Sequence, residues 1–204
     1  MPPSPDVHPH CTGSEMKSTN SNIRCEHPRP AVFLDRDGTL IEDHGDLSDP
    51  SQVVFYEDTV TALLRLADRF ALFIVTNQSG VAKGTITIEG VHRVNGYVEE
   101  YLAARGVPIA AIYVCPHLRS SGCECIKPKP HFLKEAERNF SIDLRRSFVI
   151  GDHPHDVELA MQVGATGIYV LSGHGMKHRG ELTMETIVVD GIGEATDKIL
   201  ATAS

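Results

Sequence analysis

Residues 31–40, which read AVFLDRDGTL, constrain this chain most, because four apolar residues are followed at once by two aspartates. The apolar run predicts a short buried strand, and alternation along it puts Asp35 and Asp37 on the same side. Gly38 then permits a sharp turn and a close approach to a ligand. Neighbouring carboxylates repel each other unless a cation lies between them or one is protonated. The pattern predicts a metal-assisted carboxylate nucleophile, although an acidic turn after a core strand would have the same letters.

From Ala31 onward, predicted strands and helices alternate, which indicates right-handed crossovers and a parallel sheet. Period-two and continuous apolar runs predict strands over 31–34, 72–76, 107–115, 147–150, 167–171 and 187–189. Helical periodicity and caps predict helices over 57–70, 87–105, 130–139, 156–164 and 193–202. We therefore expect an α/β fold with a three-layer, doubly wound parallel sheet. The connecting segments are too short for a large cap domain.

Polar residues at two further places fit a phosphate site. Thr76 and Asn77 end a predicted strand, and a hydroxyl and an amide there can hold phosphate oxygens, since parallel sheets bind ligands beyond the carboxyl ends of their strands. Lys127 lies in the proline-confined run IKPKP, where its cation could neutralise a nucleophile and a transferring phosphoryl group. Each feature alone is also typical of an ordinary polar loop or a basic surface turn.

A third predicted strand ends in Gly151 and Asp152, with another aspartate four residues later. A hard cation such as Mg²⁺ prefers oxygen ligands, so we expect Asp152 to complete a magnesium site with Asp35 and Asp37. Asp156 is expected to orient the loop or Lys127 instead. Histidine is a poor magnesium ligand, so the histidines of this loop are expected to pack or to contact substrate.

A cysteine and histidine cluster follows the predicted strand 107–115. Cys115 and His117 are followed, after a short loop, by Cys123 and Cys125. Three thiolates and one imidazole suit a closed, structural tetrahedral zinc site, and soft ligands favour Zn²⁺ over Mg²⁺. Buried free cysteines or a disulfide are the alternatives for the same residues.

Taken together, these motifs resemble those of the aspartate-nucleophile phosphatases of the haloacid dehalogenase (HAD) superfamily. The D-x-D-G-T run, Thr76, Lys127 and the Gly-Asp-x-x-x-Asp of 151–156 occur in the family's order, within residues 30–175. The run 75–84 and the cysteine cluster are similar to those of the bacterial heptose-bisphosphate phosphatases, with histidinol-phosphate phosphatases as close relatives. The resemblance implies Asp35 as nucleophile, Asp37 as general acid and base, Mg²⁺ as cofactor and a zinc loop.

This sequence departs from the subgroup at two places. The stretch between His117 and Cys123 is shorter than expected, and Ile126 stands where the bisphosphatases usually offer an arginine to the substrate. Arg36 and Lys83 are further candidates for binding the substrate. We expect the substrate to be a small phosphorylated sugar, and heptose 1,7-bisphosphate is the first candidate. The alternatives are histidinol phosphate or another small phosphomonoester and, outside the enzymes, a catalytically silent zinc-stabilised binding module.

Composition limits the binding partners and the compartment that we expect for this protein. The formal net charge of −8 argues against nucleic-acid or anionic-membrane binding, and no apolar run approaches the ~20 residues of a membrane span. Three of the five cysteines lie in the cluster, which suits a reducing, cytoplasmic setting. Residues 1–29 are rich in Pro, Ser, Asn and His, which predicts a disordered tail before one phosphatase domain of 30–204. We expect a monomer.

Overall fold

The computed structural model describes residues 28–183 and 185–202. Its sheet has six strands in the order β3-β2-β1-β4-β5-β6, and every neighbouring pair is parallel. This order is that of a doubly wound α/β fold. The strands are β1 (Ala31–Leu34), β2 (Ala71–Asn77), β3 (Ile109–Cys115), β4 (Phe148–Gly151), β5 (Thr166–Val170) and β6 (Ile187–Val189).

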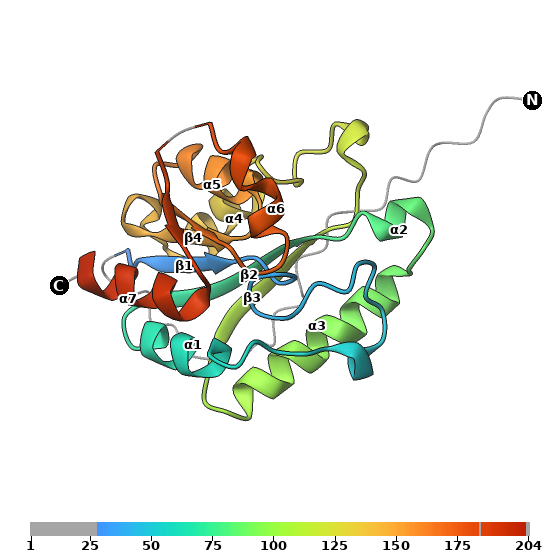
Figure 1. Ribbon diagram of the computed structural model, residues 1–204, viewed down its shortest axis with the longest axis horizontal. Coiled ribbons are helices and arrows are strands. Elements are labelled where there is room, and N and C mark those ends of the chain that lie inside the picture. Colours follow the sequence, from blue (N-terminus) through green and yellow to red (C-terminus); the bar gives the residue numbers. More distant parts are fainter. Residues whose placement is uncertain (1–27, 184, 203–204) are drawn as a thin grey trace, which may run out of the picture.

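Helices cover both faces of this sheet, as Figure 1 shows, with α1, α3 and α7 on one side and α4 and α5 on the other. The expected three-layer architecture is thereby confirmed. The α-helices are α1 (Thr59–Ala67), α2 (Gly80–Lys83), α3 (Ile88–Ala103), α4 (His131–Phe140), α5 (Pro154–Met161), α6 (Gly175–His178) and α7 (Ile192–Thr202). Single 3₁₀ turns are η1 (Pro50–Gln52), η2 (Arg119–Ser121), η3 (Leu144–Arg146) and η4 (Arg179–Glu181).

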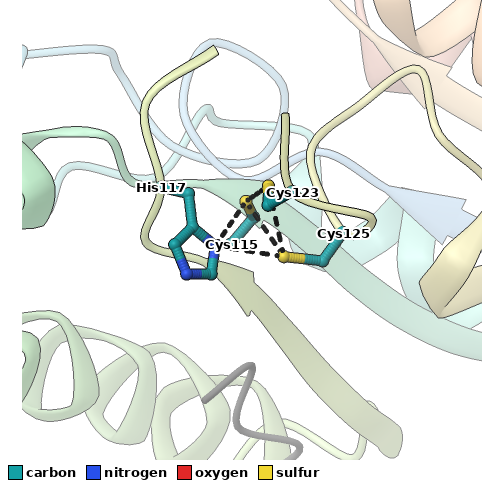
Figure 2. Close-up of side chains that lie close together, drawn as sticks. All are labelled: Cys115, His117, Cys123 and Cys125. Atoms are coloured by element: carbon teal, nitrogen blue, oxygen red, sulfur yellow. Dashed lines mark hydrogen bonds between the residues drawn. The ribbon is translucent and has the colours of Figure 1, made fainter. Parts of the chain in front are cut away.

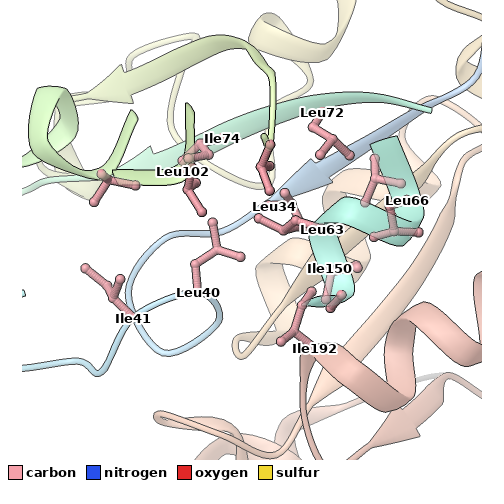
Figure 3. Packing of buried hydrophobic residues seen from close by; sticks show 14 of the residues in the cluster. Leu34, Leu40, Ile41, Leu63, Leu66, Leu72, Ile74, Leu102, Ile150 and Ile192 are labelled. Carbon is pink, nitrogen blue, oxygen red and sulfur yellow. The ribbon is translucent and has the colours of Figure 1, made fainter. Parts of the chain in front are cut away.

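The sheet is apolar on both faces because it is packed on both. Val32 and Leu34 of β1 join the core beneath α1, α3 and α7, part of which Figure 3 shows, whereas Ala31 and Phe33 join the core beneath α4 and α5. Phe33 stacks on Phe73 of β2 with ring centroids 5.1 Å apart. Burial of both faces explains why the strands read as continuous apolar runs.

The strand order reverses between β1 and β4, and this reversal positions the site. In an open parallel sheet, the crevice beyond the carboxyl ends of two such strands is where ligands bind. Asp35 directly follows β1, and Asp152 directly follows β4. The backbone N–H of Asp35 donates to the carbonyl of Ile150 at 2.9 Å, so the sheet pairing continues to the first catalytic candidate.

Local signals placed the longer helices well. Thr87 caps α3 by accepting a hydrogen bond from the Gly90 N–H at 3.1 Å, and Gly106 stands just beyond the helix with a φ of +84°. The helices α2 and α6 were not predicted from the sequence. Each has only four residues, which is too short to show a helical period.

Two expectations concern the chain outside the longer elements. The predicted disordered tail extends too far at its end, because Arg29 pairs with Ile142 in an isolated parallel bridge. The rest of that tail, residues 1–27, lies outside the described residues. No second sheet or separate cap stands over the carboxyl ends of the strands within 28–183 and 185–202. In the same part of the chain, every helix is too short or too polar to span a membrane.

Candidate active site

The loop after β1 makes a close approach to the end of β4 at Gly38. Gly38 has a φ of +80°, and a Cβ atom added there would lie 2.0 Å from Oδ2 of Asp152. Only glycine fits this position, because any side chain would overlap that carboxylate. The tight turn thus brings the aspartates of the β1 and β4 loops to one place, as the sequence predicts for Asp35 and Asp152.

Three carboxylates gather there: the partly buried Asp35 and the buried Asp152 and Asp156 each offer one oxygen, and these oxygens all lie within 4.8 Å of one another. We refer to these three residues as the carboxylate group. Lys127 lies between two of them, with Nζ 2.7 Å from Oδ1 of Asp35 and 2.7 Å from Oδ1 of Asp156. Asp156 also accepts the His153 N–H at 3.2 Å, so it does orient both the lysine and the loop.

Burial sets the charge balance of this group. It raises the pKa of Asp35 well above its ordinary value; Lys127 opposes the rise, whereas Asp156 and Asp152 add to it. Burial and the Asp156 carboxylate also raise the pKa of Asp152, to about 6. Burial alone would lower the pKa of Lys127, but the two carboxylates outweigh it and raise that pKa above its ordinary value. One ammonium group therefore faces three carboxyl groups, which leaves room for a further cation.

The second aspartate of the motif, Asp37, is held by donors from two elements. Nη2 of Arg36 lies 2.9 Å from Oδ2 of Asp37, and Nε2 of Gln78 donates to the same oxygen at 2.8 Å. Gln78 Nε2 also lies 2.8 Å from the hydroxyl of Thr76. These partners fix the direction of the Asp37 carboxylate.

Arg36 does not reach the substrate side, so its predicted role in substrate binding is wrong. Its side chain is fully buried and donates through NH1 to Oδ1 of Asn95 on α3 at 2.6 Å. The alternation that sends Asp35 and Asp37 to one side sends the residue between them to the other. Arg36 is therefore a residue that positions Asp37.

Thr76 and Asn77 lie where the sequence places them, at the end of β2. The Thr76 side chain is buried, and Oδ1 of Asn77 accepts the Lys127 N–H at 3.3 Å. Both residues line a hollow of about 260 Å³ together with Asp35, Asp37 and the rest of the carboxylate group. The site therefore offers a carboxylate oxygen, a lysine and small polar groups to one small ligand.

A second hollow of about 410 Å³ adjoins the first, and both are lined by Asn77, Ser79 and Arg119. Lys83, at the end of α2, lines this second hollow and not the first. Arg119 lies in η2 and is exposed, and its NH1 is 3.4 Å from the carbonyl oxygen of Lys127. A cationic surface therefore continues outward from the carboxylate group.

Judged by volume alone, a different hollow would be the candidate site. A larger hollow, of about 690 Å³, lies at the amino ends of the strands, where Pro30, Phe148 and Thr166 line it. Its lining combines apolar residues with Arg69, Arg146 and Lys198 and includes no carboxylate that could act as nucleophile or hold a metal ion. The chemistry of the lining residues therefore decides in favour of the smaller hollow at the carboxyl ends.

Cys115, His117, Cys123 and Cys125 converge on one point, as Figure 2 shows. We refer to these four residues as the Cys/His cluster. Five of its six ligand-to-ligand distances are between 3.3 and 3.7 Å. Zinc bonds of about 2.1 Å to nitrogen and 2.3 Å to sulfur imply tetrahedral edges of about 3.5–3.8 Å. The spacing fits zinc and excludes a disulfide among the three cysteines, whose sulfurs would be about 2.05 Å apart.

The thiol of Cys115 is already activated for metal binding. A hydrogen bond from Cys125 lowers its pKa to about 5, against the opposing effect of burial. Cys115 ends β3, and its carbonyl accepts the Gln78 N–H at 2.7 Å. Lys127 follows Cys125 by two residues. The cluster thus fixes the loop that carries the active-site lysine.

Sequence reasoning missed three contributors to this site. Gln78 carries a signal that could have revealed it, because it lies two residues after Thr76 and so projects to the same side. Asn95 carries a weaker one, since it is a polar residue on the buried face of α3, next to Val91, Val94 and Val98. Arg119 has no signal, because only the folded loop brings it beside Asn77.

His153 and His155 lie in the Gly-Asp loop and line the same hollow. Nδ1 of His153 accepts the His155 N–H at 3.3 Å and so caps α5. Burial, followed by the charge of His155, lowers the pKa of His153 to about 4. His174 donates its backbone N–H to Oδ2 of Asp152 at 2.7 Å, which ties the start of α6 to the carboxylate group.

Known proteins of one class share this fold and much of this sequence. A family model described as HAD-hydrolase-like matches residues 124–195. The D-glycero-beta-D-manno-heptose-1,7-bisphosphate 7-phosphatase of Photorhabdus laumondii is 36% identical over 169 residues, which cover 78% of this chain and 89% of that protein. The protein of the same name from Vibrio cholerae is 34% identical over 84% of this chain and 97% of its own.

A solved structure agrees. The D,D-heptose 1.7-bisphosphate phosphatase from B. bronchiseptica, complexed with magnesium and phosphate, matches with a TM-score of 0.78 at 26% identity. The match covers 85% of this chain and 99% of that one. The chain belongs to the heptose-bisphosphate phosphatase family of the HAD superfamily, and it is a phosphatase.

Proposed function

We propose that this phosphatase removes the 7-phosphate of D-glycero-D-manno-heptose 1,7-bisphosphate in a magnesium-dependent reaction. The observation that carries the proposal is the pair of adjoining hollows. One holds a carboxylate nucleophile beside a lysine, and the other has two cations, Lys83 and Arg119. A bisphosphate needs two such anion sites. The names of the relatives support the same substrate.

The carboxylate group fits a hard cation. Its three oxygens lie within 4.8 Å of one another, two of the three residues are buried and the third is partly buried, and a single ammonium faces them. Asp35, Asp152 and the backbone carbonyl of Asp37 would hold Mg²⁺, while Asp156 stays engaged with Lys127. The bound ion would offset negative charge on the phosphoryl oxygens. A relative's structure is described as complexed with magnesium and phosphate, which supports this choice.

In the first step, Asp35 attacks phosphorus in line. Lys127 holds Oδ1 of Asp35, so Oδ2 is the attacking atom. The new bond joins this oxygen to phosphorus as the bond from phosphorus to the sugar oxygen breaks. Thr76, Asn77 and Lys127 hold the other phosphoryl oxygens, so that most of the acceleration comes from positioning and electrostatics. The product is an aspartyl-phosphate.

Asp37 supplies and then removes the proton. Asp37 gives this proton to the departing sugar oxygen and later takes one from the water that cleaves the aspartyl-phosphate. Arg36 and Gln78 keep the carboxyl group directed at the hollow in both steps.

Arg119 would replace the arginine that is missing at position 126. Ile126 is buried, whereas Arg119 is exposed and lines both hollows. We propose that Arg119 and Lys83 bind the phosphate that is not cleaved. Arginine binds phosphate in a bidentate manner and lysine as a point charge, so Arg119 should contribute more.

The proposal includes structural zinc in the Cys/His cluster and a monomer in the cytoplasm. Four ligands in tetrahedral spacing close the coordination sphere, so the ion would order the loop before Lys127 and would not contact substrate. Three thiols held 3.3–3.7 Å apart without forming a disulfide are suited to a reducing compartment.

The test is phosphate release from heptose 1,7-bisphosphate with magnesium, with histidinol phosphate and an aryl phosphate assayed in parallel. Asp35→Asn should abolish release, by about 10⁴-fold or more, while Asp68→Asn, at an exposed residue just after α1, should match the wild type. Rapid turnover of the heptose alone supports the proposal. Turnover of histidinol phosphate alone would keep the nucleophile and overturn the substrate.

A further inference from the structure

A third group of metal-type ligands lies beside the active site and takes no part in the proposed reaction. His153, His178 and Glu181 each offer one ligand atom, and these atoms lie within 4.8 Å of one another. They come from three elements: His153 caps α5, His178 ends α6 and Glu181 ends η4. We refer to these three residues as the rim cluster.

The hydrogen bonds around the rim cluster leave defined atoms to bind an ion. Nδ1 of His153 accepts the His155 N–H, so Nε2 is the atom of His153 that can bind a metal. The nearby His155 and His174 have carboxylates of their own, Glu158 at 2.9 Å and Asp43 at 3.2 Å. The rings of His153 and His178 are neighbours, with centroids 4.8 Å apart and ring planes inclined by 42°.

His178 and Glu181 already form a pair of the right chemistry. Nδ1 of His178 is 2.6 Å from Oε1 of Glu181, and these side chains are 19% and 60% exposed. On a tetrahedral zinc ion, nitrogen and oxygen ligands are about 3.3 Å apart, so a small opening of this pair would admit the ion. The exposed end of Glu181 gives the ion a route from solvent.

We propose that the rim cluster is a second zinc-type site, in which His153, His178 and Glu181 bind one transition-metal ion and leave a fourth position to solvent. Two imidazoles and one carboxylate are suited to Zn²⁺ and discriminate against Mg²⁺, which prefers oxygen ligands. The site differs from the Cys/His cluster in being open and in having no sulfur ligand. It is therefore the weaker of the two zinc sites.

The position of the rim cluster gives the ion a mechanical effect. It would link the start of α5 to α6 and η4, the two segments that flank Asp152. His153 lines the active-site hollow, and the His174 N–H holds Oδ2 of Asp152. An ion in the rim cluster would therefore stabilise the wall of the hollow without contacting the carboxylate group.

Zinc content measures this site directly. The full chain is equilibrated with a slight excess of Zn²⁺ in saturating Mg²⁺, which occupies the carboxylate group, and bound zinc is counted per chain. Wild type should hold one zinc more than His178→Ala and one more than Glu181→Gln. The exposed His92→Ala on α3 should match wild type. Zinc bound by residues 1–27 is common to all four proteins and cancels in the differences.

A second measurement separates binding from misfolding. In a chelator, all four proteins should have the same Tm. At about a hundred times the dissociation constant, Zn²⁺ should raise the Tm of Cys123→Ser by roughly 5–10 °C, since this variant keeps the rim cluster. It should leave Cys123→Ser/His178→Ala unshifted. Equal zinc content in wild type and Glu181→Gln, whose side chain is exposed, would overturn the proposal.

Discussion

The carboxylate group and the Cys/His cluster lie at the same edge of one sheet, yet different kinds of structure position their residues. Strand ends and the first turn of α5 position the carboxylates, so the sheet's hydrogen bonds hold them together whether or not an ion is bound. The cluster's ligands after Cys115 lie in a loop whose regular structure is one 3₁₀ turn, η2. The fold makes the first site, whereas we expect the ion to make the second.

The metal-ligand atoms of the carboxylate group and of the Cys/His cluster also differ. Oxygen ligands are suited to a hard ion that exchanges water and phosphate, and thiolates are suited to a soft ion that stays in place. Lys127 belongs to both regions, because it pairs with two carboxylates and follows Cys125 by two residues. The proposed structural and catalytic roles are therefore coupled through one short segment.

Breaking the Cys/His cluster should have the largest effect on the fold. Cys123→Ser should remove one zinc per chain and lower the free energy of unfolding by about 3 kcal/mol, since the loop loses its ordering ion. Activity should fall about 10–100-fold as Lys127 loses its support, a typical loss when the support of a site is removed. Zinc analysis, urea unfolding and phosphate release measure the three effects.

The matched control for this variant is Glu124→Gln. It changes a carboxylate that stands between Cys123 and Cys125 in the sequence. Glu124 is 81% exposed and pairs with Lys129, so its loss should leave zinc content and stability unchanged. If Cys123→Ser kept its full zinc content at low free Zn²⁺, the assignment of the cluster would be wrong.

Removing one charge from the carboxylate group should have a smaller effect on stability, and the effect should have the opposite sign. Without Mg²⁺ at pH 7.5, Asp152→Asn should be more stable than wild type by about 1–3 kcal/mol, because a buried like charge is removed. The pKa of Asp152 rises from 3.8 to about 6 on folding, so its contribution to stability is full below pH 3.8 and is lost as pH rises through about 6. The advantage of the variant should therefore disappear near pH 4.

Urea unfolding at pH 7.5 and pH 4.5, with and without Mg²⁺, checks this sign. Magnesium should stabilise wild type at pH 7.5 and have little effect on Asp152→Asn. The exposed Asp68→Asn serves as the control. If the wild type were more stable than Asp152→Asn in the absence of metal, this result would contradict the charge balance described for this group.

The smallest effect is expected at the border between the two regions. Arg119→Ala should raise the KM for heptose 1,7-bisphosphate about tenfold and leave the KM for a monophosphate unchanged, since one charge-assisted contact to the uncleaved phosphate is lost. Steady-state kinetics on both substrates measure this, with the exposed Lys134→Ala on α4 as the control. An equal loss on both substrates would assign Arg119 to the cleaved phosphate instead.

The sequence by itself predicted most of the fold and most of the residues that gather at the two main sites. Apolar runs bounded by polar residues marked the strands, and parallel strands bring their carboxyl ends to one edge, so Asp35, Thr76 and Asp152 had to meet. The Cys/His cluster followed from residue type and spacing alone. The alternation rule that placed Asp35 and Asp37 also contained the answer for Arg36, had it been applied to that residue.

Only the tertiary structure decided which residues from distant segments complete the site. The contact of Arg36 with Asn95 spans 59 positions, and the route of the loop to Arg119 depends on how it folds around the Cys/His cluster. The rim cluster likewise forms only where α5 meets α6. Local patterns report on hydrogen bonds and burial within an element, whereas these contacts arise from packing between elements, which no single segment encodes.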